Sequence, residues 1–403
     1  MEYEQRLAGN IWKYGLLLIA NKRIFAAILG VYYLTVSDVT AQTIGLILLA
    51  GSVSGFIFEI PSGYVSDKIG HKEALVISRI LMVVSTVFFL CANSVMLLVL
   101  GSVFLSASAA FLSGTGSAFM HETLQGLRRE HEYAQVMGKV SSLGFAVPIV
   151  LMVSVPFLVS VSYKMPFVLA LVIDLVGLFA ALSLTVPHVP IEEIEEVGVM
   201  NFRQVICEGY QLSYFSIALF SGIVSGVLFS VSGFRAPYQA VLQVPVIWYG
   251  VLFGIGRVCA SLMLAFSGRI KKHFTLPSFY LFQLVLYTLL MLVLGFVTTG
   301  WVVVTVFIII NAFQWGLTKI DEGYQLEIIK KSKFKATLLS TGSQIDLAIS
   351  GIVGYSLGYA ILQTSYSKGF AYLAILFVVV LVPLYVYIAK RYTAGAYGSV
   401  EVG

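Results

Sequence analysis

Long apolar segments recur along the whole chain, and short polar stretches separate them. A helix needs roughly 20 predominantly apolar residues to cross the hydrocarbon core of a bilayer, and these segments reach about that length. The pattern therefore predicts an all-α membrane protein with twelve spanning helices. The predicted spans are residues 12–36, 42–64, 74–92, 95–120, 135–160, 165–186, 213–234, 246–267, 276–298, 300–320, 336–362 and 368–389.

Composition excludes a soluble globular domain. Of the 403 residues, 59% are hydrophobic and only 11% are charged, whereas charged residues make up about 25% of a soluble domain. The three cysteines, Cys91, Cys207 and Cys259, show no CxxC spacing, so we expect no disulfide framework, metal or cofactor. The first apolar segment contains Lys22 and Arg23 and lacks a cleavage site after a short apolar core, which argues against a removable signal peptide.

The positive charges predict the orientation of the spans. Cytoplasmic loops of membrane proteins carry an excess of Lys and Arg, and most of the 25 such residues fall on one side if both termini are cytoplasmic. The residues that would then face outward are Lys164, Arg235 and Lys368. We therefore expect a multi-pass protein of the inner, cytoplasmic membrane. This placement accounts for the net charge of +5 without a nucleic-acid partner.

The longest polar connection, residues 187–212, lies near the middle of the chain with six predicted spans on each side. It predicts an N-terminal six-helix bundle at 1–186, a cytoplasmic linker at 187–212 and a C-terminal six-helix bundle at 213–403. Apolar residues recur at helical spacing from Phe202 to Gly209, so part of the linker is either an interfacial helix or a solvated acidic segment.

An internal repeat supports this division. Residues 44–63 align without gaps on residues 249–268, which places span 2 on span 8. The aligned glycine pairs are Gly45 with Gly250, Gly51 with Gly256, and Gly63 with Gly268. Two bundles repeated in the same orientation would give this six-span offset.

One charged stretch, EIPSGYVSDKIGHKEAL at residues 59–75, interrupts the apolar pattern and predicts a tight connection between two spans. Its spacing resembles the loop motif between helices 2 and 3 of the major facilitator superfamily. The matching positions are Gly63, Asp67, Lys68, Gly70, Lys72 and Leu75, with His71 in place of a more usual Arg or Lys. The resemblance implies two bundles that alternate access to a central cavity.

Further segments refine the resemblance. The lead-in at 59–63, the run at 113–116 and the stretch at 335–340 resemble bacterial drug-efflux-like members. Two features depart from proton-coupled members, because span 4 has no Arg and span 5 lacks the fuller Gly-Pro pattern of drug/proton antiporters. These departures weigh against antiport of that type without excluding it.

Charges within the predicted spans are the candidate substrate-binding groups, because each costs roughly 2.5 to 3.5 kcal/mol at the centre of a bilayer. A span that began after Lys22 and Arg23 would be too short to cross, so both lie within it; they either line the cavity or extend to the interface. Arg257 lies in span 8. The resemblance places helix 10 at the cavity and so adds Phe313, Gln314 and Trp315.

Acids within the spans are the candidate proton-coupling groups. Asp346 and Asp174 lie deepest, and burial together with nearby cations can bring a carboxylate into the range where it binds and releases protons. Asp346 is the first choice, since the resembled fold places helix 6 and Asp174 at the periphery, where a scaffold role is the alternative. Glu59 lies two residues before Pro61, so it is either a coupling group or a structural acid at a kink.

The remaining charges suggest a cytoplasmic gate. The predicted gating residues are Gly63, Asp67, Lys68, Gly70, Lys72, Arg79 and Glu122, together with the helix start at Lys335. Their contacts would hold the cytoplasmic side closed in one state and break in the other.

Together these features predict a secondary active transporter, coupled to protons, that exports a small amphipathic or anionic molecule by alternating access. Import of an organic anion is the alternative. A membrane-embedded enzyme or sensor is a third class, but the five histidines all lie in or beside predicted cytoplasmic loops, and no P-loop, HExxH or GxSxG motif occurs. We therefore expect no enzyme. The expected partners are a small-molecule substrate, protons and lipid, and the expected state is a monomer.

Overall fold

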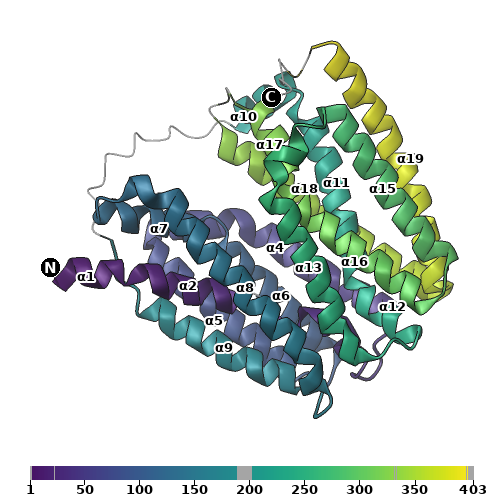
Figure 1. The fold of residues 1–403 in the computed structure, drawn as a ribbon, viewed down its shortest axis with the longest axis horizontal. Coiled ribbons are helices and arrows are strands. Elements are labelled where there is room, and N and C mark those ends of the chain that lie inside the picture. Colours follow the sequence, from purple (N-terminus) through teal and green to yellow (C-terminus); the bar gives the residue numbers. More distant parts are fainter. Residues whose placement is uncertain are drawn as a thin grey trace. The chain divides into compact units, whose positions relative to one another are not determined.

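The computed structural model describes residues 2–21, 23–187, 202–330, 332, 334–395 and 397, and it is helical throughout (Figure 1). The helices, with η for a 3-10 helix, are α1 (Glu2–Ala8), α2 (Asn10–Asn21), η1 (Ile24–Ala27), α3 (Leu29–Tyr33), α4 (Ala41–Ile69), α5 (His71–Leu90), α6 (Val95–Leu112), α7 (Thr115–Gly126), η2 (Glu130–Glu132), α8 (Tyr133–Val159), α9 (Met165–Leu182), α10 (Phe202–Gln211), α11 (Tyr214–Gly233), α12 (Arg235–Val241), η3 (Val246–Trp248), α13 (Tyr249–Ala265), α14 (Ser267–Lys271), α15 (Leu276–Phe296), α16 (Gly300–Gly316), α17 (Thr318–Ile328), α18 (Lys335–Gln363) and α19 (Tyr366–Thr393).

Eleven helical segments in the described part of the chain are long and apolar enough to cross a membrane. They correspond to the second through twelfth predicted spans. Several are composed of two consecutive helices, such as α6 with α7 and α16 with α17. The all-α membrane fold predicted from sequence is confirmed, whereas the count of twelve spans and the cytoplasmic termini stay predictions.

The first predicted span, 12–36, was wrong as a single helix. The chain leaves α2 at Asn21, and Arg23 adopts an extended conformation before η1 and α3. The Arg23 guanidinium donates to the freed carbonyl of Asn21 at 3.2 Å, which offsets the lost helical hydrogen bond. Lys22 lies outside the described residues. Aromatic contacts anchor the segment beyond the break, because the rings of Phe25 and Tyr32 lie 4.7 and 4.3 Å from that of Phe167.

The tight connection predicted within 59–75 is confirmed, but the helices on either side extend further into this stretch than predicted. The helix α4 continues through Pro61 to Ile69, and α5 begins at His71, so the connection is the single residue Gly70. Its φ of 106° and ψ of 147° suit a glycine far better than any residue with a side chain. The motif charges therefore lie on the ends of two helices rather than in a loop.

The described residues form two compact units. Unit 1 comprises the described residues within Met1–Val39, Ala50–Gly198 and Val246–Val251. Unit 2 comprises the described residues within Thr40–Leu49, Val199–Pro245 and Leu252–Gly403. Of the two alternatives for Phe202 to Gly209, the structure shows a helix, α10, and residues 188 to 201 of the linker lie outside the described residues.

Unit 1 packs α2, α5, α7, α8 and α9 around an apolar core. Leu17, Leu75, Phe119, Leu124 and Ala181 are fully buried there, one or two from each of four helices. Burying such side chains supplies the packing that holds helices together where lipid gives no hydrophobic drive.

Unit 2 is organised around α11. This helix buries 67% of its most apolar window, whereas the other spans bury 28 to 50%. It packs against α18, while α15 packs against α19 (Figure 1). Because α11 is enclosed on most sides, its polar side chains must find partners inside the unit.

The predicted internal repeat has matching surroundings in the structure. A Cβ added to Gly45 would come 2.6 Å from the carbonyl oxygen of Gly354, and one on Gly250 would come 2.3 Å from that of Met152. Each glycine of this aligned pair thus lets its helix approach the backbone of another, in unit 2 and unit 1 respectively. The third pair, Gly63 and Gly268, faces open space in both copies.

Candidate functional site

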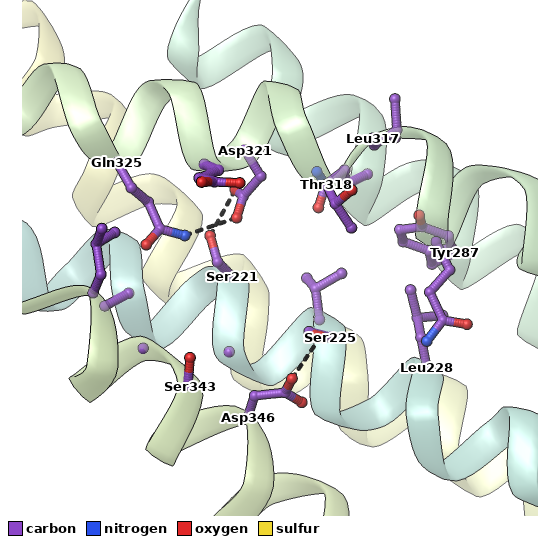
Figure 2. A pocket seen from close by; sticks show the side chains of 18 residues that line it. Ser221, Ser225, Leu228, Tyr287, Leu317, Thr318, Asp321, Gln325, Ser343 and Asp346 are labelled. Atoms are coloured by element: carbon purple, nitrogen blue, oxygen red, sulfur yellow. Dashed lines mark hydrogen bonds between the residues drawn. The ribbon is translucent and has the colours of Figure 1, made fainter. Parts of the chain in front are cut away.

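A cavity lined by polar and acidic side chains lies within unit 2. It has a volume of about 340 Å³ and is lined by α11, α15, α16, α17 and α18 (Figure 2). That volume is in the range of small-molecule sites in proteins. Among the lining residues, three are acids and none is Lys, Arg or His.

Two serines of α11 hold the two deepest carboxylates of the cavity. Ser221 donates to Oδ1 of Asp321 at 2.7 Å, and Ser225 donates to Oδ2 of Asp346 at 2.9 Å (Figure 2). Residues four apart lie on the same face of a helix, so α11 can present both hydroxyls to the cavity at once. The serines thereby fix one carboxylate from α17 and one from α18.

Asp321 is fully engaged by the protein. Gln325, one turn further along α17, donates to Oδ2 of Asp321 at 2.8 Å, and Tyr280 of α15 adds a further hydrogen bond. Tyr214 in turn donates to Oε1 of Gln325 at 3.1 Å. Asp321 is therefore the centre of a hydrogen-bonded network that ties α11, α15 and α17 together.

Asp346 is less engaged. Ser225 is its one hydrogen-bond partner within the described part of the chain, and its carboxylate is half-buried at the wall of the cavity. In Figure 2, Asp346 and Ser343 come from α18, on the side of α11 away from Asp321. One carboxylate is thus saturated by protein groups, and the other is left with capacity for a proton or a ligand.

Of the predicted substrate-binding residues that the structure describes, one belongs to the lining of this cavity. Gln314 lines it and accepts a hydrogen bond from Ser232 at 3.0 Å. The guanidinium of Arg257 lies 4.3 Å from the ring centre of Trp315, which is a close cation–π contact. Phe313 instead packs its ring 5.9 Å from that of Phe282 and does not line the cavity.

Arg257 belongs to a stack of cations and rings. Phe253 lies between Arg257 and Arg235, with its ring centre 5.1 Å from the first guanidinium and 4.4 Å from the second. The Nε of Arg257 has no hydrogen-bond partner among the described residues. Arg235, placed in an outer loop by the charge pattern, is in fact buried at the start of α12.

The charged residues predicted deep in the first half gather in unit 1. Arg79 is fully buried and donates to Oδ1 of Asn21 at 3.1 Å. Asp174, only 5% exposed, accepts from Thr86 at 2.6 Å, and both Arg79 and Arg23 act on it electrostatically. The cavity beside Arg23 and Asp174 measures about 10 Å³, which leaves room for one water molecule at most.

The predicted gating residues are divided between two places. His71 bridges helices at the end of α4, since its Nδ1 lies 2.8 Å from Oγ of Ser66 and its Nε2 lies 3.2 Å from Oε1 of Glu122 on α7. Asp67 and Lys68 are exposed, and Lys68 lies over the ring of Tyr64. Arg79 instead belongs to the buried cluster of Asn21, Arg23, Arg79, Asp174 and Thr86.

The other members of the motif and Glu59 have plainer surroundings. Gly63 is exposed, and Lys72 is half-buried beside the turn at Gly70. Glu59 is half-buried and hydrogen-bonds to Ser113 at the end of α6. Whether these residues take part in gating or coupling stays a prediction.

Sequence reasoning passed over Asp321 because it lies one residue beyond the end of the predicted span 300–320. A signal was present, however, in the polar positions of span 7 and span 9. Ser221 and Ser225 are four residues apart, and so are Gln283 and Tyr287, which both line the cavity. Polar residues at this spacing within apolar spans indicate one polar face on each helix.

Comparison with known proteins shows what the chain is similar to. The model of the Major Facilitator Superfamily matches residues 14–319. The chain is similar to the uncharacterized MFS-type transporter YxaM of Bacillus subtilis (strain 168), with 21% identity over 248 residues that span 60% of this chain and 61% of that protein.

Two solved structures share the fold. The nucleoside transporter NupG superposes with a TM-score of 0.74 at 13% identity and covers 97% of this chain and 99% of its own. A bacterial homolog of the human lysosomal transporter Spinster, inward-facing and unoccupied, gives 0.72 at 15% identity and covers 99% of both chains. At these identities the likeness establishes the fold alone.

Proposed function

The chain belongs to the Major Facilitator Superfamily and is a membrane transporter rather than an enzyme, and on that premise we propose a proton-coupled secondary active transporter. It exports a small amphipathic molecule by alternating access between its two six-helix bundles. The observation that carries this proposal is the cavity of unit 2, in which Asp346 keeps capacity for a proton or a ligand.

Asp346 meets the physical requirements of a coupling group. An ionised acid within a membrane is expensive, so a proton or a substrate cation that neutralises it is bound favourably. The other titratable side chains at this cavity are Asp321 and Glu322 from α17 and Tyr287 from α15, and no base lines it. Since the protein itself supplies no counter-charge there, protonation and deprotonation of Asp346 can change how the unit binds and moves.

The same lining favours a neutral or cationic substrate. The carboxylates repel an anion, and together with the uncharged polar groups they accept the N–H donors of an amine, while Leu228 and Leu317 provide apolar contact for the rest of the molecule. One solved structure is a nucleoside transporter and the other a homolog of a lysosomal transporter, so the shared fold does not determine the substrate. Export rests on the resemblance to drug-efflux-like members.

The second candidate is import of an organic anion, and Arg257 is the observation that favours it. Its guanidinium keeps an unpaired Nε–H and lies against Trp315, which together could hold a carboxylate on an aromatic ring. Lys22 and Arg23 would contribute from the first half if they reach the transport path.

We also propose twelve spans with cytoplasmic termini, a monomer, and the inner membrane as the location.

A flux assay separates the two candidates. Purified protein in liposomes would be given an inward or outward pH gradient, and the movement of procainamide, an amphipathic amine, and of benzoate, an organic anion, would be followed. We expect gradient-driven movement of the amine against the proton flow. Benzoate movement in its place would support the anion importer, and flux that ignores the pH gradient for both probes would contradict proton coupling.

A further inference from the structure

Two buried polar side chains of α15 face the unit 2 cavity without partners. Gln283 is 5% exposed and Tyr287 is 2% exposed, and both line the cavity. Neither side chain makes a hydrogen bond with another residue in the described part of the chain. Being four residues apart, they lie on one face of α15.

This situation differs from that of Asp321, Gln325 and Gln314, which line the same cavity. Asp321 and Gln325 bond to each other and to Ser221 and Tyr214, and Gln314 accepts from Ser232. Polar side chains inside a folded protein are nearly always paired with protein groups, water or a ligand, and the polar atoms of Gln283 and Tyr287 are not fully buried but open to the cavity. Two such side chains facing one cavity indicate capacity reserved for a ligand.

The chemistry of the pair defines that ligand. A Gln side chain offers one carbonyl acceptor and two N–H donors, and a Tyr hydroxyl adds another donor or acceptor. Neither carries a charge, so they suit a neutral group with its own donor and acceptor. The carboxylate of Asp346 lines the same cavity from α18.

We propose that Gln283 and Tyr287 recognise an amide group of the substrate, and that the amine of the same molecule binds at Asp346. This inference rests on the proposed function, since it names the substrate as an amphipathic amine that also carries an amide. The amide N–H is accepted by the Gln283 carbonyl, and the amide C=O accepts from Gln283 or Tyr287.

A matched pair of compounds tests this assignment. Procainamide and procaine are the same amphipathic amine except that an amide N–H in the first is an ester oxygen in the second. In thermal-shift titrations of the purified protein, we expect procainamide to stabilise at a concentration at least tenfold lower than procaine does, because the ester leaves Gln283 without its donor.

Variants on α15 localise the effect. Gln283→Met keeps the length of the side chain but removes its polar atoms, and we expect it to reduce the preference for procainamide to less than twofold. Tyr287→Phe should weaken procainamide binding several-fold. The control is Thr288→Val, which removes a buried hydroxyl with no partner among the described residues, on the same helix but outside the cavity lining, and should leave the preference intact.

The melting temperature without ligand distinguishes recognition from scaffolding. Because Gln283 is unpaired, Gln283→Met should melt at the same or a higher temperature than the wild type, whereas a structural Gln would lower it on replacement. Wild-type protein that binds both compounds equally, or not at all, would overturn the amide assignment. So would a Gln283→Met variant that keeps the preference or melts lower. None of these results bears on proton flux through Asp346, which is measured separately.

Discussion

Asp174 in unit 1 and Asp346 in unit 2 are both aspartates of membrane helices, and both bond to a hydroxyl on a neighbouring helix. Their surroundings differ in every other respect. Asp174 is 5% exposed, interacts electrostatically with Arg23 and Arg79, and adjoins a cavity of about 10 Å³. Asp346 is half-buried, lines a cavity of about 340 Å³ and has no basic residue among its fellow lining residues.

The difference teaches how to separate structural from functional charge in a transporter of this kind. A carboxylate enclosed with cations is compensated by the protein in its resting state, so changing it disturbs the fold. A carboxylate at the wall of a cavity without cations has no counter-charge there, so its charge is compensated only when a proton or a ligand binds. Their positions within the predicted membrane spans alone would not distinguish the two residues.

The largest expected effect comes from removing charge in the unit 1 cluster. Asp174→Asn keeps an acceptor for Thr86 but leaves Arg23 and Arg79 uncompensated, and we expect a loss of about 3 kcal/mol in unfolding free energy. The melting temperature in detergent should fall by about 6 °C. The matched control, Asp346→Asn, should change it by less than about 2 °C. Equal losses in the two variants would remove the distinction between the units.

Asp67 offers the next test, because it lies in neither the cluster nor the cavity. If the end of α4 acts in gating, Asp67→Asn should slow procainamide transport about tenfold, which corresponds to about 1.4 kcal/mol in the barrier. Thermal-shift affinity for the same compound should stay within about twofold. A loss of binding in a folded variant would place Asp67 in the substrate site instead.

Arg257 sharpens the choice between an amine and an anion. Under the proposed function, Arg257→Gln should lower procainamide transport less than about threefold, since the residue lies in the cation–aromatic stack with Phe253 and Trp315. If instead benzoate is carried by the wild type and lost in this variant, the anion importer becomes the better account.

The smallest effect is expected at a partly exposed ion pair in unit 1. Arg129 donates to both carboxylate oxygens of Glu132, and this hydrogen bonding lowers the pKa of Glu132 below its usual value. The pair therefore stabilises the fold above the unfolded-state pKa, and the contribution is lost as pH falls through the lower folded-state pKa. Glu132→Gln should lower the melting temperature by less than about 1 °C at pH 7 and by still less near pH 3. A larger drop would mean that this segment couples to the buried cluster.

Much of the fold could be predicted because the signal is local. The length of each apolar run and the glycine register of 44–63 and 249–268 are readable without knowing any neighbour. The break after Asn21 was not, because the extended conformation of Arg23 and its hydrogen bond to the Asn21 carbonyl leave no mark in the apolar pattern. The extension of α4 to Ile69 was likewise hidden by charges that resemble a loop in sequence and lie on a helix in three dimensions.

The candidate site was only partly predictable for the same reason. Asp346 could be singled out by its depth within an apolar span, and Gln314 by its place in span 10. Asp321 could not, because its role depends on Ser221 and Tyr280 from two other helices. The expected anion site was drawn from cations in the sequence, whereas the cavity that the structure forms in unit 2 is lined by acids and amides.

The most direct test of the central claim is proton flux through liposomes that contain the wild type, Asp346→Asn or Asp174→Asn. A pH-sensitive dye inside the vesicles would report the proton movement driven by a procainamide gradient, normalised to the amount of folded protein. We expect Asp346→Asn to lose at least 100-fold of this flux while melting like the wild type. Per folded molecule, Asp174→Asn should keep it. Proton movement that persists in folded Asp346→Asn would contradict the account.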